Sequence, residues 1–393
     1  MSADREKRAV VVTGMGIVCP LGCSSEAIIH ALNQTDASSG IDRQTFAPYP
    51  VRPAVNTNGD RFLRRPGERR VMSDMMLHAV EAAGQALSSA GLIGREEGLD
   101  DINMLVAAGM SARDPRADAE LLAERGNTAQ TGPAFNRRLQ SELKPTLFLA
   151  QLSNLVAGNL SLMFGIKGSS RTISGEEIAG AQCLETAFRQ IASGQREVVL
   201  VGGSFSAERP EVIASYAAAG ILAHNEVPDA GAVLATASVF LVLESATSAE
   251  MRGQKPLARM RDVQTRLGNR KAKGDISSNA AKLLDTWSRA DSGDKIAIVD
   301  GSPSRSVLSE ESDALIEIAR TSKAMSLAGR FGRADRFGHP IDASALLSAW
   351  IGLSMLNEPD FPAEDKVDCS PDAVLCCDWG LRFGESEVLL EKA

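Results

Sequence analysis

The stretch 170–204 constrains the fold more than any other part of the chain. A short strand-like run ends at Gly175, and apolar residues at spacings of three and four then predict a helix with one buried face. The apolar run 198–201 predicts the strand that follows. This order of strand, sharp turn, helix and strand holds a residue exposed at a helix N-terminus, where backbone N–H groups favour a negative charge. Two glutamates, Glu176 and Glu177, occupy that turn.

Glu177, the second of the two, is either a catalyst or the mark of a lost one, since many enzymes place a nucleophile at such a turn. A structural role is favoured for Glu177, because an acid in the first turn of a helix gains about 0.3–1 kcal/mol from the helix dipole. The two neighbouring carboxylates repel each other. We therefore expect one of them to be partly protonated or paired with an arginine.

Composition narrows the class of protein. The 393 residues are 44% hydrophobic and 23% charged, which is enough to bury a large core in one big domain or two of ordinary size. No run approaches the roughly 18 apolar residues of a membrane-spanning helix. The N-terminus lacks the apolar stretch of a secretory signal. We expect a cytoplasmic protein with no membrane partner.

Several classes of ligand are disfavoured. A net charge of −8, no dense basic block and 4% aromatic residues argue against a nucleic-acid partner. The six cysteines lack metal-ligand spacing, so we expect buried thiols and no metal site. Gly14 and Gly16 predict a turn after the first strand, but the third glycine of a dinucleotide loop is absent and Pro20 interrupts the place of its helix. No cofactor is expected.

The second part of the chain resembles the first in the order of its expected elements. Strand-like and helical runs alternate in both, which predicts an α/β fold with a sheet in each half. We place the division between residues 1–245 and 246–393. No low-complexity linker separates the two, so the halves are expected to pack as one body.

Three blocks of sequence resemble a known family. The opening VVVTGMGIVCPLG (10–22), the run PTLFLAQLSNLVAGNLSLMFGIKG (145–168) and the block around Glu177 are similar to β-ketoacyl-ACP synthases of the thiolase superfamily, the elongating type related to synthase II. The resemblance covers nearly the whole chain. It implies a thiolase fold, with two similar βαβαβαββ halves in an αβαβα layered arrangement.

The family's catalytic residues are mostly replaced. Such enzymes use a Cys nucleophile, which accepts the acyl chain, and two His residues, which promote decarboxylation of malonyl-ACP. The matching positions here are Glu177 for the Cys, Asp300 for the first His and His339 for the second. The Lys usually found before the second His is Ala334. A carboxylate cannot form an exchangeable thioester, so the resemblance implies no catalytic residues. Asp300 has a simpler expected role, which is to cap the turn that follows it.

This combination resembles the chain length factor (KSβ) subunit of heterodimeric type II polyketide synthases. The resemblance implies a non-catalytic subunit that pairs with an active ketosynthase and shapes the tunnel for a polyketide or polyene chain on an acyl carrier protein. The segment 112–130 is expected to meet solvent or a partner. It is also a predicted site of chain-length control, together with four side chains that would line or gate the tunnel: Leu147, Phe148, Leu381 and Phe383.

Two other functions stay open. The first is a ketosynthase-like decarboxylase that supplies a starter unit from malonyl-ACP, although Asp300 would place an anion opposite the developing enolate. The second is a homodimeric acyl-binding scaffold. Co-expression separates them, because a chain length factor should purify 1:1 with an active ketosynthase, whereas a decarboxylase should release CO₂ unaided.

Overall fold

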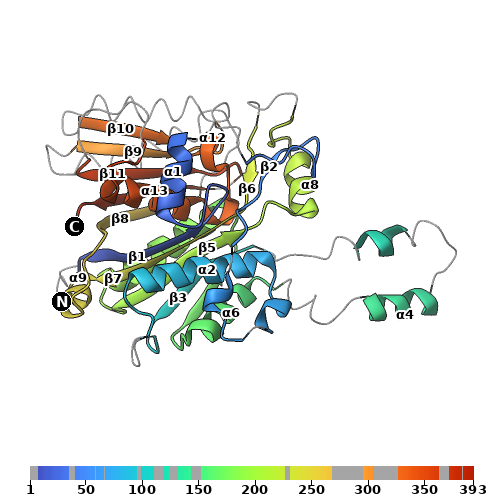
Figure 1. Ribbon diagram of the computed structural model, residues 1–393, viewed down its shortest axis with the longest axis horizontal. Helices are drawn as coiled ribbons and strands as arrows, with labels where there is room; N and C mark the ends of the chain where they lie inside the picture. The colour runs from blue at the N-terminus through green and yellow to red at the C-terminus, as the bar shows by residue number, and fades with distance from the viewer. Residues whose placement is uncertain are drawn as a thin grey trace.

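The computed structural model of the protein describes residues 8–34, 40–57, 59–65, 67–94, 99–109, 118–123, 132–142, 152–225, 231–267, 295–304, 326–362, 371–382 and 384–393. A large mixed sheet runs through the molecule with helices against it (Figure 1). This arrangement confirms the predicted α/β class.

The strands are β1 (Val10–Val18), β2 (Val51–Arg52), β3 (Asn103–Ala107), β4 (Ser170–Ile173), β5 (Val198–Phe205), β6 (Leu234–Ala235), β7 (Ala237–Ser245), β8 (Ala258–Arg266), β9 (Lys295–Gly301), β10 (Ser326–Gly332), β11 (Ala373–Trp379) and β12 (Glu385–Glu391). The α-helices are α1 (Ser25–Gln34), α2 (Asp74–Ser89), α4 (Pro133–Glu142), α6 (Asn154–Phe164), α7 (Glu177–Ala192), α8 (Pro210–Ala218), α9 (Ala246–Met251), α12 (Ala334–Phe337) and α13 (Ser344–Asn357). Short 3₁₀ turns are η1 (Gly59–Phe62), η2 (Glu68–Val71) and η5 (Ile341–Ala343).

The sheet contains one strand pattern twice. Its first set runs β4-β3-β5-β7-β1 and its second β10-β9-β11-β12-β8. When the five strands of each set are ranked along the chain, both sets lie in the order third, second, fourth, fifth, first. The parallel and antiparallel pairings also fall at the same places in both sets. The predicted two similar halves are therefore present, and β1 and β8 join them edge to edge through three residue pairs. The division of the chain at residue 245 stays a prediction.

Helices lie on both sides of the strands. On one side α2 contacts β1 and β7 and packs with α6, while on the other α7 and α13 pack on each other. Helix α7 contacts β5 and β8, and α13 contacts β7 and β11, so this pair lies between the two sets of strands. The residues Ser344–Met355 of α13 are all buried, as expected for a helix that is covered on every side.

Glycines allow several close approaches. Gly14 and Gly16 do not form the predicted turn: they lie within β1, where added Cβ atoms would come 2.1 and 2.0 Å from carbonyl oxygens of α2. Close packing of strand on helix therefore explains both residues. Gly180 in α7 and Gly203 in β5 allow η5 to pack closely, because Cβ atoms there would lie 2.7 and 3.0 Å from the carbonyl oxygen of Asp342.

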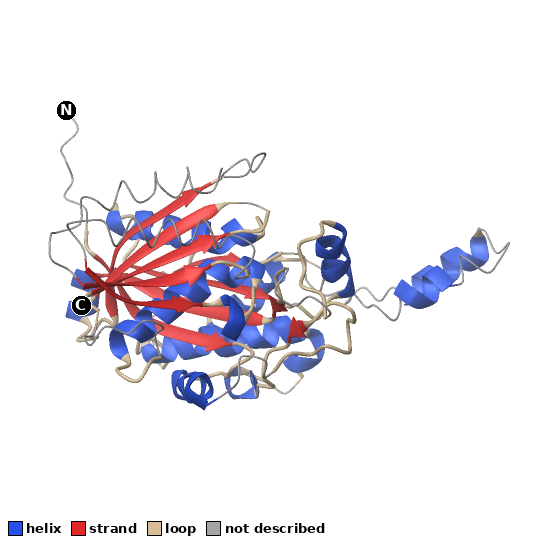
Figure 2. Ribbon diagram, turned by 90° about the horizontal axis from the view of Figure 1, so that it is seen from above, coloured by secondary structure: helices blue, strands red, loops and turns tan. Residues whose placement is uncertain are grey.

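Helix α4 lies apart from the body of the molecule (Figures 1 and 2). Residues 118–123 are also helical, and Leu122 among them is 66% exposed. An exposed leucine on this short helix agrees with the expectation that the segment meets solvent or a partner. The rest of the segment 112–130 falls outside the described residues.

Candidate functional site

The predicted sharp turn is present between β4 and α7. Glu176 occupies the position before the helix with φ 53° and ψ −132°, an unusual backbone conformation for a residue that is not glycine. Such a conformation costs about 1–3 kcal/mol and is found mainly at functional sites. It places Glu177 at the first position of α7, at the end of the buried face that carries Ile178 and Leu184.

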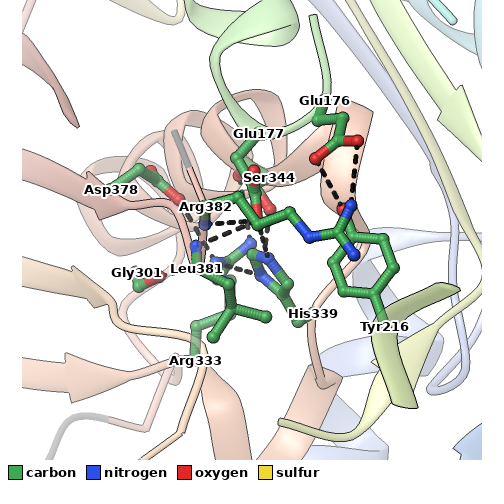
Figure 3. Close-up of polar contacts among 10 residues, drawn as sticks. All are labelled: Glu176, Glu177, Tyr216, Gly301, Arg333, His339, Ser344, Asp378, Leu381 and Arg382. Atoms are coloured by element: carbon green, nitrogen blue, oxygen red, sulfur yellow. Dashed lines mark hydrogen bonds and ion pairs between the residues drawn. The ribbon is translucent and has the colours of Figure 1, made fainter. Parts of the chain in front are cut away.

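Glu177 is buried, which corrects the prediction of an exposed residue at this turn. Its side chain is 2% exposed, because the loop between β11 and β12 covers it. The Oε1 atom of Glu177 accepts hydrogen bonds from the backbone N–H of Leu381 at 2.9 Å and of Arg382 at 3.3 Å. Two successive amides thus hold one carboxylate oxygen (Figure 3).

His339 faces this carboxylate. Its Nε2 atom lies 3.7 Å from Oε1 of Glu177, and its side chain is fully buried. Its Nδ1 atom lies 3.2 Å from the hydroxyl of Ser344 and 3.4 Å from Nη2 of Arg333. A guanidinium can only donate, so Nδ1 is assigned as the acceptor and the ring proton is on Nε2, on the side of Glu177.

The two groups differ in charge at neutral pH. Burial lowers the pKa of His339 and outweighs the opposing pull of Glu177, with the charge of Arg333 acting in the same direction as burial. Burial raises the pKa of Glu177, but His339 and the backbone N–H of Leu381 outweigh it, so that pKa lies below its ordinary value. An ionised carboxylate therefore faces a neutral imidazole.

Arg333 is a buried cation that the sequence comparison missed. It donates to the carbonyl oxygens of Gly301 at 2.7 Å and Ser344 at 3.3 Å, and lies 3.2 Å from Oδ1 of Asp378. The resemblance matched the family's lysine to Ala334, and the buried charge lies instead on the residue before it, at the N-terminus of α12. The sequence did contain a signal for this charge, because Arg333 directly precedes Ala334.

Asp300 lies at the end of β9 and has a local role. Its Oδ1 accepts hydrogen bonds from the backbone N–H of Ser302 at 3.0 Å and from the hydroxyl of the same residue at 2.6 Å. Its other oxygen pairs with Arg330. The alternative prediction that Asp300 caps the turn is confirmed, and Arg330 balances the negative charge of its carboxylate.

Glu176 is held on the outer side of the turn. It accepts a hydrogen bond from the hydroxyl of Tyr216 at 3.1 Å, and its Oε1 lies 3.4 Å from Nη1 of Arg382. The guanidinium of Arg382 lies 4.1 Å from the centre of the Tyr216 ring and donates to the carbonyl oxygen of Ser215 at 2.9 Å. The expected pairing of one glutamate with an arginine is confirmed for Glu176 (Figure 3).

Asp342 is a third carboxyl group at the site that was not predicted. It is buried in η5, and its Oδ1 makes no hydrogen bond within the described part of the chain. Burial raises its pKa to about 7, and the charges of Glu176 and Glu177 add to this shift against the backbone N–H of Gly109. The group is therefore protonated in a large share of molecules near neutral pH.

The predicted tunnel residues are only partly described. Leu381 packs in an apolar cluster that includes Tyr216 and Ile341. Leu147, Phe148 and Phe383 fall outside the described residues. The gate role of all four stays a prediction.

The turn at 174–177 contains no cysteine. Cys183, on α7, is fully buried in the core, and burial raises its pKa well above its ordinary value, so its reactive thiolate is suppressed. Over the described ranges, no three His, Cys, Asp or Glu side chains gather as metal ligands. Nor does any described helix have the length and apolar content needed to cross a membrane. The chemistry available at the turn is that of a fixed carboxylate beside a neutral imidazole.

Curated relatives match about two thirds of the chain. The 3-oxoacyl-[acyl-carrier-protein] synthase 2 of Vibrio harveyi is 29% identical over 274 residues, which cover 65% of this chain and 62% of that protein. The enzyme of the same name from Vibrio cholerae serotype O1 is 29% identical over 269 residues, covering 63% and 61%. The match thus spans less than two thirds of these relatives.

Solved structures resemble the chain over nearly its full length. The ishigamide ketosynthase/chain length factor superposes with a TM-score of 0.76 at 18% identity, covering 98% of this chain and 100% of that one. A type II PKS acyl-carrier protein in complex with its ketosynthase bound to the hexaketide gives 0.75 at 18% identity, with the same coverage. These likenesses confirm the thiolase-type fold. The family model for the N-terminal domain of β-ketoacyl synthases matches residues 7–249, and the chain therefore belongs to the β-ketoacyl synthase family.

Proposed function

We propose that the chain is the non-catalytic chain length factor subunit of a cytoplasmic, heterodimeric type II ketosynthase. It would pair with an active ketosynthase and help set the length of a polyketide or polyene chain on an acyl carrier protein. The observation that carries the proposal is the fixed carboxylate of Glu177, held by the N–H groups of Leu381 and Arg382 where the family has its nucleophile.

This carboxylate is unsuited to the family's reaction. A ketosynthase needs a thiolate that can accept and release an acyl group. Glu177 is buried and hydrogen-bonded, and the nearest thiol on the same helix, Cys183, is buried in the core. The scaffold of an enzyme without its nucleophile is what a shape-determining subunit requires.

The proposed partners are an active ketosynthase and the acyl carrier protein. Support comes from the names of two similar structures, one a ketosynthase/chain length factor and the other an acyl-carrier protein in complex with its ketosynthase. The exposed Leu122 on the helix 118–123 and the outlying helix α4 are the regions we propose to contact the ketosynthase.

The test is co-expression with a Cys-His-His ketosynthase and a carrier protein. We expect a 1:1 complex that elongates malonyl units, and a changed product length when Leu381 is replaced by Ala, since side-chain volume in a packed tunnel sets where growth stops. Leu162→Ala, at a 66% exposed leucine on α6, is the matched control and should leave product length unchanged. A chain that never associates with such a ketosynthase, or that releases CO₂ from malonyl-ACP alone, would contradict the proposal.

A further inference from the structure

Strand β8 is paired along nearly all of one edge but only along the start of the other. On the first side it pairs with β12 from Arg259 to Arg266. On the second side, where β1 lies beside it in Figure 1, it pairs only from Ala258 to Met260. Within the described ranges, no strand pairs with this second edge at residues 261–266. An unpaired edge presents backbone N–H and C=O groups that can bind another chain.

A groove lies beside this free edge. At Arg8, just before β1, the backbone N–H donates to the carbonyl oxygen of Ala192 at the end of α7, at 3.0 Å, so it is bonded to the helix and not to β8. The groove between Arg8, the last turns of α7 and residues 262–266 has a volume of about 1150 Å³. Sites for small molecules have roughly 300–1,000 Å³, and a strand of five residues spans about 17 Å. The groove therefore suits an extended peptide.

The acids of the groove are already engaged. Two carboxylates and three arginines line it. Asp262 accepts a hydrogen bond from the side-chain amide of Gln264 at 2.8 Å. Glu185 pairs with Arg189 and accepts a hydrogen bond from the hydroxyl of Thr265. Both acids are thus used within the chain.

The charge that remains available in the groove is positive. Arg266 is exposed, and its guanidinium makes no hydrogen bond or ion pair within the described part of the chain. Arg8 pairs with Glu197 but, like any guanidinium, has five donors and can bind a second carboxylate. Phe188 is half-buried at the edge of the core and gives the same groove an apolar surface. An occupant with both carboxylates and apolar side chains is therefore complementary to the groove.

We infer that this groove binds an extended, acidic peptide segment of a partner protein, which adds to the free edge of β8 as a strand. Backbone hydrogen bonds to residues 262–266 give the affinity. Alternate side chains select the peptide, because carboxylates meet Arg266 while apolar side chains meet Phe188. Helix α7 has 16 residues, so the groove lies about 24 Å from Glu177 and is separate from the site at the turn.

The test is binding of a labelled seven-residue peptide of alternating valine and glutamate, capped at both ends, to the full-length chain. Fluorescence anisotropy should show saturable binding with a Kd of about 100 μM or tighter. A peptide with lysine in place of glutamate should bind about tenfold more weakly. A peptide with alternate amides N-methylated should lose a similar factor, since it cannot bond to a strand edge.

Three results with these probes would overturn the inference. The first is that the peptide does not bind, and the second is that all three peptides bind equally. The third is displacement of the peptide by inorganic phosphate at matched ionic strength, because it would identify a site for small anions instead.

Arg266→Glu should weaken binding of the acidic peptide about fivefold or more. Arg259→Glu is the matched control, because Arg259 is also exposed on β8 but lies outside the groove, in the stretch that is paired on both sides. The control should bind like wild type, and equal losses in the two variants would contradict the inference. Both side chains are exposed, so each melting temperature should stay within about 2 °C of wild type. The three peptides are compared on wild type, which decides the matter even if a variant fails to fold.

Hydrogen exchange locates the bound peptide. Binding should slow exchange at alternate amides within 262–266 and leave 258–260 unchanged, since these residues are already paired with β1. Protection elsewhere, or a dimer of the chain that excludes the peptide and dissociates on dilution, would show that the groove has another role. The assay contains no ketosynthase, so its outcome is independent of the proposed subunit role.

Discussion

Oε1 of Glu177 and Nε2 of His339 lie 3.7 Å apart, with side chains 2% and 0% exposed. The pair has an ionised carboxylate and a neutral imidazole, at positions that the family resemblance matches to a thiol and a histidine. A negative charge held there by backbone amides repels the developing oxyanion that a ketosynthase must stabilise. We therefore propose that the arrangement does not support acyl transfer.

Replacing Glu177 with Cys should restore acyl loading without restoring elongation. The new thiol would lie at a helix N-terminus beside His339, which favours the thiolate. Asp300, which the resemblance matches to the family's first histidine, would still supply no imidazole for decarboxylation of malonyl-ACP. Mass spectrometry after incubation with an acyl carrier protein substrate should show one acyl group on Glu177→Cys and none on wild type. Loading of wild type to the same extent would contradict the account.

Arg382→Ala should loosen the loop that covers Glu177. The substitution removes the stacking on Tyr216 and the bond to Ser215, and it also removes a partly exposed pair with Glu176 that solvent weakens. We expect a loss of about 1 kcal/mol in the free energy of unfolding. Hydrogen exchange at the Leu381 amide should become faster.

The control for this variant is Arg189→Ala, which breaks a helix-surface pair in which the arginine is 74% exposed. It should change stability by no more than about 0.5 kcal/mol and leave the Leu381 amide unchanged. Exchange at Leu381 that is equally fast in both variants would show that Arg382 does not hold the loop.

Arg333→Ala should be strongly destabilising. It leaves Asp378 buried without its partner and breaks the bond to the carbonyl oxygen of Gly301. Loss of one partner of a buried pair costs about 3–5 kcal/mol. Lys167→Ala, at a pair whose side chains are 70% and 59% exposed, should cost less than about 1 kcal/mol. Chemical denaturation measures the free energy of unfolding of both variants. Similar losses in the two would contradict the burial of the pair formed by Arg333 and Asp378.

Asp342 should make stability depend on pH. Its pKa is raised to about 7 when folded, so between its ordinary value of 3.8 and about 7 the folded state binds more protons than the unfolded state. Stability then falls as pH rises through that window, by at most about 1.4 kcal/mol per unit, and is level above it.

The variant Asp342→Asn cannot titrate, so it isolates this effect. The stability of wild type minus that of Asp342→Asn should decrease from about pH 4 to about pH 7, as measured by denaturation at each pH. A difference that is constant or rises with pH would rule out a buried, protonated carboxyl group at this position.

The sequence predicted the local part of the site. Apolar spacing predicted the buried face of α7, and Gly175 with the two glutamates after it predicted the sharp turn. Both depend on neighbours along the chain. Repulsion between adjacent carboxylates predicted that one of the two would be partly protonated or paired with an arginine. The sequence identified neither Glu176 as the paired residue nor Arg382 as its partner.

The rest depends on contacts between distant segments. Glu177 was expected to be exposed, but the amide of Leu381, 204 positions away, covers it. Arg333 was missed because position-by-position comparison stopped at Ala334, while the short helix α12 directs the neighbouring side chain to His339. Gly14 was assigned to a turn because the approach of α2 to β1 cannot be read from the glycine itself.

The chain belongs to the β-ketoacyl synthase family, and we propose that it lacks the family's thioester chemistry. The most direct test is to incubate the purified chain, alone, with an acyl carrier protein substrate and malonyl-ACP and to analyse protein and products by mass spectrometry. The account predicts no acyl adduct on the chain and no elongated product. An acylated chain that extends the acyl group by malonyl units would contradict it.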